Sequence, residues 1–170
     1  LALGVPTVSL DRSATMLAAV PGIRVLGDAC HLPFRHRAFG SVAALYMLYH
    51  LKDPRRALAE SLRILRPGGL FAASAPSRYN DPELADLLPP SEPDLFDAEN
   101  AEEMLAEFFE KIEVNRWDTP LVHLTDRNAL HIYLQGRQLS QTIIDRALHH
   151  VKTPLTLTKR GALFYARKRV

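Results

Sequence analysis

Two aspartates stand directly after short apolar runs in the first part of this chain. Asp11 follows residues 5–10, and Asp28 follows residues 23–26 and Gly27. If both runs are strands of an open α/β sheet, both carboxylates lie beyond the carboxyl ends of the strands, where such sheets bind ligands. One carboxylate there can accept hydrogen bonds from both hydroxyls of a ribose, and the second can accept one from an adenine amino group.

A purely structural role fits the same two positions. Asp11 could help to cap a helix entered through Ser13, and Asp28 could simply start a turn. Spacing alone supports the nucleoside site and the structural role equally.

Strands and helices are expected to alternate up to residue 75. Asp53 followed by Pro54 is the clearest helix start, and the run at 42–48 is continuous enough for a strand buried on both faces. The expected order is strand 5–10, a helix after Ser13, strand 23–26, strand 42–48, a helix from Asp53 that stops at Pro67-Gly68-Gly69, and strand 70–75. This alternation predicts an α/β fold with a mostly parallel sheet and helices on both faces.

The pattern loosens after residue 75. Five prolines between 76 and 98 indicate a long surface loop with at most a short helix at 83–88. The remaining expected elements are a helix at 99–109, a strand at 112–117, helices at 126–134 and 139–151, and a closing strand at 162–166. We expect one domain over residues 1–170, with a substrate-side insertion at about 118–154 between the last two strands.

Several short motifs follow one another in a recognisable order. They are Asp11, Gly27-Asp28-Ala29, Leu32-Pro33-Phe34 followed by Phe39, Tyr49-His50-Leu51, Glu60, and Arg66-Pro67-Gly68-Gly69. This set resembles the class I S-adenosylmethionine-dependent methyltransferases, and within them the methyltransferase type 11 branch of ubiquinone and menaquinone biosynthesis. The resemblance covers about residues 1–76, and residues 158–168 resemble that family's final strand.

The resemblance implies a Rossmann-like sheet, S-adenosylmethionine as cofactor and methyl transfer to a small-molecule acceptor. It places Asp11 on the ribose hydroxyls, and Asp28 and Ala29 on the adenine. Leu45 and Tyr46 would lie under the sulfonium and methionine portion. In the family, segments such as 118–154 shape the acceptor pocket.

Two further features are candidate sites. His50 follows the strand at the rim of the expected cleft and could act as a general base toward an acceptor hydroxyl. A rim histidine packed on Tyr49 is the simpler interpretation. Cys30, His31 and His36 lie close together, but their spacing matches no zinc pattern, and we expect no metal site.

The chain departs from the family in two places. The family usually has Asp where Gly40 stands, so the start of that strand is expected to be less well anchored. The family also has a first strand ending in a glycine-rich turn, and no Gly-x-Gly-x-Gly occurs here. We therefore expect an N-terminally truncated methyltransferase sheet with an open slot between the strand ending at Asp11 and the strand at 42–48.

An empty slot in the sheet would strongly destabilise the fold. A strand of about five residues leaves on the order of ten backbone groups unpaired, each costing roughly 1–3 kcal/mol when buried, against a typical domain stability of about 5–15 kcal/mol. Either the flanking strands pair directly, another chain supplies the strand, or the missing residues belong to a longer protein. The slot predicts marginal stability and a homodimer through the exposed edges, and it keeps open a non-catalytic relic or association module as the alternative function.

Composition excludes several classes of partner. Twenty-one Lys and Arg against 19 Asp and Glu leave a formal net charge of +2, too small to indicate a nucleic-acid partner. No apolar run approaches the roughly 20 residues of a membrane span. A single cysteine suits a reducing compartment, and we expect a cytoplasmic protein.

Overall fold

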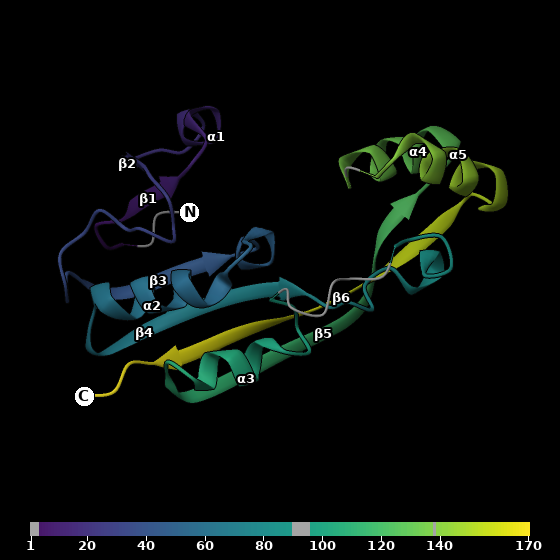
Figure 1. Cartoon of the computed structure of the whole chain (residues 1–170). Coiled ribbons are helices and arrows are strands. Elements are labelled where there is room, and N and C mark those ends of the chain that lie inside the picture. Colours follow the sequence, from purple (N-terminus) through teal and green to yellow (C-terminus); the bar gives the residue numbers. More distant parts are fainter. Residues whose placement is uncertain (1–3, 90–95, 138) are drawn as a thin grey trace.

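Six strands form two sheets in the residues that the computed structural model describes, which are 4–89, 96–137 and 139–170 (Figure 1). The smaller sheet pairs β1 (Val8–Asp11) with β2 (Ile23–Leu26) in parallel. The larger sheet has the order β3-β4-β6-β5, formed by β3 (Phe39–Leu45), β4 (Leu65–Pro76), β6 (Leu155–Arg167) and β5 (Glu110–Leu124). The parallel arrangement predicted up to residue 75 is confirmed for β1–β2 and β3–β4, whereas β6 runs antiparallel to both β4 and β5.

The first βαβ segment, residues 4–27, is called here the N-terminal unit. Its helix α1 (Ala14–Ala18) begins after Ser13, whose Oγ accepts a hydrogen bond from Met16 N at 3.3 Å, as the sequence predicted. Leu17 is the only buried side chain among these residues. The unit therefore has backbone pairing and a capped helix but almost no core of its own.

Helix α2 (Pro54–Ile64) packs on the larger sheet. Asp53 caps it by accepting a hydrogen bond from Arg56 N at 3.2 Å, and Pro54 occupies the first turn, where no internal partner for its nitrogen is needed. The helix ends at Ile64 and the chain enters β4 at once. The predicted stop at residues 67–69 was therefore placed too late, although Gly68 does adopt a positive φ of 70°.

Strand β3 differs most from expectation. It covers Phe39–Leu45 rather than 42–48, and Leu48 instead begins the short helix η1 (Leu48–His50). The expectation that this strand is buried on both faces is wrong, because most of its residues are exposed and, within the described residues, it pairs on one side only. The register with β4 shifts between Phe39 and Ser41, at Gly40.

Strands β5 and β6 form a long antiparallel hairpin that carries two helices at its far end. The hairpin is longer than predicted because residues 118–124 continue the ladder with residues 155–160. Helices α4 (Arg127–Gly136) and α5 (Gln141–His150) make up what is called here the helical lobe. Two shorter helices, η2 (Pro82–Leu84) and α3 (Ala101–Ala106), lie along the connection from β4 to β5.

Two separate hydrophobic cores stabilise the chain. The first joins the larger sheet to α2 and α3, and Phe71, Phe96 and Phe164 are fully buried in it. The second lies under the helical lobe and consists of Leu84, Leu124, Leu130, Leu134, Ile144, Ala147 and Leu157. None of the described helices combines the length and the apolar character needed to cross a bilayer.

Strands β1 and β3 are not paired with each other. Each belongs to its own sheet, and among the described residues β1 pairs only with β2 and β3 only with β4. Direct closure of the slot by these two strands, one of the three outcomes considered from the sequence, is therefore wrong.

Candidate functional site

Asp11 is the last residue of β1 and is exposed. Its Oδ1 accepts a hydrogen bond from Ser13 N at 2.8 Å, so it does support the entry to α1. Within the described residues Oδ2 has no hydrogen-bond partner. The structural role thus uses one carboxylate oxygen and leaves the second available to a ligand.

Asp28 lies in the loop that follows β2. Its Oδ1 accepts a hydrogen bond from Cys30 N at 2.8 Å, and this bond is the main reason that the pKa of the Asp28 carboxyl is lowered, against a smaller opposing effect of desolvation. His31 Nδ1 stands 3.9 Å from Oδ2. Ala29, between them, packs against the first core. The loop therefore presents an ionised carboxylate on a fixed backbone.

The same loop is fastened to α2. Glu60 Oε2 accepts a hydrogen bond from Leu32 N at 2.8 Å, and Arg63 donates to the carbonyls of Leu32 and Phe34, both at 2.8 Å. Glu60 and Arg63 also pair at 2.7 Å, and this hydrogen bond is the main cause of a lowered pKa for Glu60. These four residues, called here the tether, connect the N-terminal unit to the first core.

The end of β3 carries a strained residue. Tyr46 has a φ of 52°, in the left-handed region that non-glycine residues rarely adopt, and its N–H donates to the carbonyl oxygen and to Oγ of Ser74, both at 3.1 Å. Leu45 and Tyr46 are 54% and 53% exposed. Backbone strain of this kind concentrates at ligand sites, but the sequence gives no sign of it here.

Beyond Tyr46 the chain presents two rings. The His50 ring packs on the Tyr49 ring with centroids 4.1 Å apart and planes tilted by 43°, which is the simpler interpretation given above for this histidine. Burial raises the pKa of the Tyr49 phenol, nearby Tyr46 adds to the rise, and the Arg137 guanidinium opposes it. A role for His50 as general base stays a prediction.

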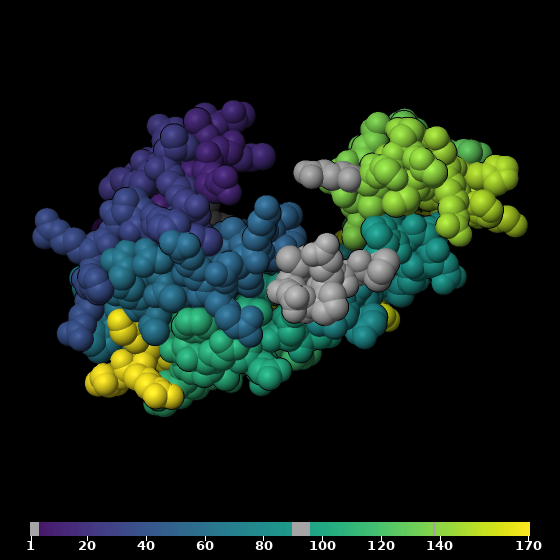
Figure 2. Space-filling model, viewed as in Figure 1, coloured from purple at the N-terminus to yellow at the C-terminus, as the bar shows by residue number. Residues whose placement is uncertain are grey.

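The helical lobe stands across a hollow from these residues. Figure 2 shows the hollow between the purple N-terminal unit and the lime helical lobe, and in Figure 1 both β1 and β3 point toward it. Residues from the ends of both sheets and from the inserted helices thus border one space.

A buried charge cluster anchors the helical lobe to the sheet. Asp81, which is fully buried and has a φ of 55°, accepts hydrogen bonds from Tyr133 Oη at 2.6 Å and Lys159 Nζ at 2.7 Å, and it also contacts Arg137. Lys159 Nζ donates in addition to Tyr133 Oη at 2.6 Å. No local sequence motif marks this cluster, because its hydrogen-bonded pairs join residues that lie 26 to 78 positions apart.

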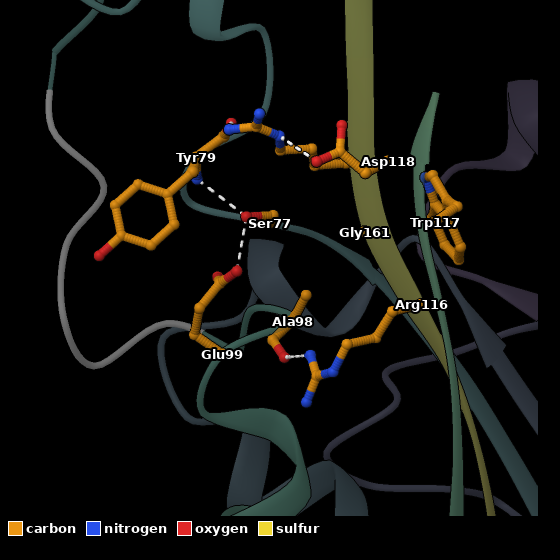
Figure 3. A pocket seen from close by; sticks show the side chains of 9 residues that line it. Ser77, Tyr79, Ala98, Glu99, Arg116, Trp117, Asp118 and Gly161 are labelled. Carbon is orange, nitrogen blue, oxygen red and sulfur yellow. Dashed lines mark hydrogen bonds and ion pairs between the residues drawn. The ribbon is translucent and has the colours of Figure 1, made fainter. Parts of the chain in front are cut away.

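A separate cavity lies beside β5 and β6. Its volume is about 370 Å³, and it is lined by residues of β5 and β6, of the segment after β4 and of the segment before α3, among them Trp117, Glu99 and Arg160 (Figure 3). Arg160 Nε donates to Asp118 Oδ2 at 3.0 Å there. None of the site residues expected from the sequence lines this cavity. Elsewhere, the described residues contain no cluster of three or more His, Cys, Asp or Glu placed to hold a metal ion.

Comparisons with known proteins show what the first part of the chain is similar to. Residues 2–73 match the model of the methyltransferase domain. These residues are therefore similar to that family. The match includes β1 to most of β4, and with it Asp11, Asp28 and Tyr46.

Individual relatives agree with this assignment. The demethylmenaquinone methyltransferase of Renibacterium salmoninarum is 38% identical over 71 residues, which is 39% of this chain and 30% of that protein. The chain therefore spans less than a third of the length of this relative.

Solved structures extend the likeness to the whole fold. The YcgJ protein of Bacillus subtilis aligns over 96% of this chain and 82% of its own, with 16% identity and a TM-score of 0.67. Phosphoethanolamine N-methyltransferase 2 of Haemonchus contortus, solved with S-adenosyl-L-methionine, aligns over 98% of this chain and 44% of its own, with 19% identity and a TM-score of 0.60. The chain thus has the Rossmann-like methyltransferase fold, and the helical lobe falls within the aligned region.

Proposed function

We propose that this protein transfers the methyl group of S-adenosylmethionine to a small-molecule acceptor. The observation that carries the proposal is the family match of residues 2–73, which contains the residues expected to bind the cofactor. In the structure Asp11 is the last residue of β1 and Tyr46 directly follows β3, and both strands point toward the hollow. This is where an open α/β sheet binds its ligand.

The residues present fit the nucleoside end of that cofactor. Asp11 keeps Oδ2 available for the ribose hydroxyls, and the Asp28 carboxylate stays ionised because Cys30 N donates to it. Asp28 and Ala29 would hold the adenine. Leu45 and Tyr46 offer exposed surface for the methionine portion.

The cofactor supplies a sulfonium-bound methyl group that is already activated, so the chain's task is to position and shield the acceptor. In the transfer, an electron pair of the acceptor forms the new bond to the methyl carbon while the carbon–sulfur bond breaks toward sulfur. His50, exposed at the rim beside Tyr49, is the candidate to take the acceptor's proton.

The same proposal covers the localisation, domain organisation and oligomeric state of the protein. We infer a cytoplasmic enzyme without a nucleic-acid partner, built as one domain in which residues 118–154 form a substrate-side insertion. Among the described residues β1 and β3 each pair on one side only, which favours a homodimer in which a strand of the second copy fills the slot. The comparisons do not favour the alternative of a non-catalytic association module.

Calorimetric titration with S-adenosylhomocysteine tests the proposal. Asp11→Ala should weaken binding about tenfold or more, since hydrogen bonds to a charged group contribute roughly 1.5–3 kcal/mol. Asp145→Ala is the matched control, because Asp145 is an exposed aspartate on α5 far along the chain from β1. Binding that is indifferent to Asp11→Ala would overturn the assignment.

A further inference from the structure

All four strands of the larger sheet start or end at the edge where β4 begins. β3 starts there with Phe39 opposite Leu65, and β6 ends there with Arg167 opposite Leu70. β5 starts beside the end of β6, with Glu110 opposite Arg167. This edge, which includes the marked C-terminus in Figure 1, is called here the amino edge and consists of residues 35–39, 65–70, 110–113 and 165–170.

Seven Lys and Arg side chains lie on the amino edge. Lys168 is half-buried, and its Nζ donates to the carbonyls of Leu62 and Leu65 at 2.7 and 2.9 Å, where a cation stabilises the end of α2. The other six are exposed, and they are Arg35, Arg37, Arg66, Lys111, Arg167 and Arg169.

Hydrogen bonds hold the segments that carry these cations against one another. Arg37 N donates to Arg63 O at 3.1 Å, which joins the segment before β3 to the end of α2. Gly68 N donates to Lys168 O at 3.0 Å, and Arg167 Nη1 donates to Gly68 O at 3.3 Å. The cations before β3, at the start of β4 and at the end of β6 therefore belong to one surface.

Few negative charges face these cations. Glu110 Oε2 lies 3.9 Å from Arg169 Nε, and among the described residues no other acid lies within 4.0 Å of the seven. Glu113 lines a cavity of about 340 Å³ together with Lys111 and Arg167. Even with Glu113 and the carboxylate of Val170 counted, positive charges outnumber negative ones by more than two to one. Because the whole chain has a formal net charge of only +2, the side chains elsewhere have a net negative charge.

The structure of the amino edge favours one class of polyanion over another. Nucleic-acid-binding proteins place a helix or a strand pair in a groove, or stack exposed rings on bases. At the amino edge strands only start or end, and the half-buried rings of Phe34 and Phe39 pack on each other with centroids 4.9 Å apart. A bilayer with anionic headgroups needs neither feature, because each Lys or Arg near its surface adds to binding through charge alone.

We propose that the amino edge docks the protein onto a membrane surface that contains anionic phospholipids. The exposed arginines donate to the headgroup phosphates, to which a guanidinium fork is well matched. The net negative remainder of the chain is repelled by the same surface, so the amino edge faces the lipid. Tyr46 follows the other end of β3, a strand of seven residues and therefore about 20 Å away, and stays accessible. The inference does not depend on the proposed function.

Co-sedimentation of the full chain with vesicles tests the proposal. Vesicles of phosphatidylcholine alone are compared with vesicles in which about 30% of the lipid is phosphatidylglycerol. We expect the partition coefficient to be about tenfold or more higher for the anionic vesicles at low ionic strength, and this preference to disappear at about 1 M salt. Equal partition into both kinds of vesicle at low ionic strength would overturn the proposal.

Two double variants locate the docking surface. Arg35→Gln with Arg169→Gln should lower partition into the anionic vesicles about tenfold or more, because two charges leave the amino edge. Arg127→Gln with Arg146→Gln is the matched control, since it removes two exposed arginines from the helical lobe, and its partition should stay close to that of the unchanged chain. Equal partition of the two double variants would overturn the proposal.

Fluorescence anisotropy with labelled duplex DNA tests the other class of polyanion at the same ionic strength. Binding to DNA that is weakened in the Arg35→Gln, Arg169→Gln variant, without binding to anionic vesicles, would assign the surface to nucleic acid and overturn the proposal. The affinity of this variant for S-adenosylhomocysteine should equal that of the unchanged chain. Failure of the membrane surface and failure of the proposed function are therefore distinguishable.

Discussion

The N-terminal unit and the helical lobe stand on opposite sides of the hollow, and they are stabilised in different ways. The helical lobe has its own core, in which Leu130, Leu134 and Ala147 are fully buried. The N-terminal unit buries only Leu17 among its described residues, while four of its large apolar side chains are exposed, namely Val5, Met16, Ile23 and Leu26 at 61–66%.

This difference shows that correct local structure does not by itself stabilise a unit. The N-terminal unit has a regular parallel strand pair and a capped helix, yet much of its apolar surface is exposed among the described residues, and we expect it to depend on the tether to the first core. The helical lobe buries its apolar faces against the ends of β5 and β6. We therefore expect the unit proposed to hold the nucleoside to be the less stable of the two.

The largest effect is expected at Asp81. Asp81→Ala leaves Lys159 and Arg137 without their buried carboxylate and should lower the free energy of unfolding by about 3–5 kcal/mol. Urea denaturation followed by circular dichroism measures the loss. Asp81→Asn is the control because asparagine tolerates the positive φ and keeps an acceptor, so it should cost less. No measurable loss in Asp81→Asn, which lacks the charge, would contradict a role for the charge.

Truncating one leucine in each region tests the difference in stability between the N-terminal unit and the helical lobe. Leu130→Ala should cost about 2–5 kcal/mol because the side chain is fully enclosed, whereas Leu17→Ala should cost about 2 kcal/mol or less because few buried groups surround it. Met16→Ala should change the free energy of unfolding little, because Met16 is 66% exposed. A larger loss at Leu17 than at Leu130 would reverse the stated order of stability.

Substitution by alanine should have opposite effects on stability at two glycines, one in the hairpin and one at the end of α4. A Cβ at Gly161 would overlap the Trp117 indole and come within 2.7 Å of the Ala75 carbonyl oxygen, so Gly161→Ala should destabilise by about 1–3 kcal/mol. Gly136, the last residue of α4, has nothing within 4 Å of such a Cβ, and Gly136→Ala should stabilise by up to about 1 kcal/mol. Thermal unfolding distinguishes them by opposite shifts of Tm.

The smallest effect is expected from protonation of Glu60 in the tether at low pH. The folded pKa of Glu60 is lowered from 4.5, so its contribution is fully present above that value and is lost as pH falls through the lower folded pKa. Hydrogen-exchange protection factors in the N-terminal unit should therefore fall at acid pH before those in the helical lobe. Glu60→Gln should produce the faster exchange already at pH 7, and identical exchange in both units across this range would contradict the tether.

The sequence predicted those parts of the fold that depend on local signals. The starts of α1 and α2 are marked by Ser13 and by Asp53 with Pro54, side chains that act within one turn. The length of β5 and the exposure of β3 were mispredicted because both depend on which strand lies alongside, and neighbours in a sheet come from distant sequence.

The residues of the candidate site also fall into those that local signals mark and those that depend on distant contacts. Asp11 and Asp28 could be proposed because each directly follows a strand and belongs to a motif of the resembled family. Arg137 and Asp81 could not, since their contact joins residues 56 positions apart and α4 arrives there only through the extended hairpin. The backbone strain at Tyr46 could not be predicted either, because it follows from how β3 ends rather than from the residue type.

Hydrogen exchange with and without S-adenosylhomocysteine tests the central claim most directly, that the N-terminal unit and the end of β3 together form a cofactor site. The account predicts added protection at residues 10–13, 28–31 and 45–49, with residues 141–150 of α5 unchanged. Protection confined to other segments, or calorimetrically detected binding without protection at these three, would contradict it.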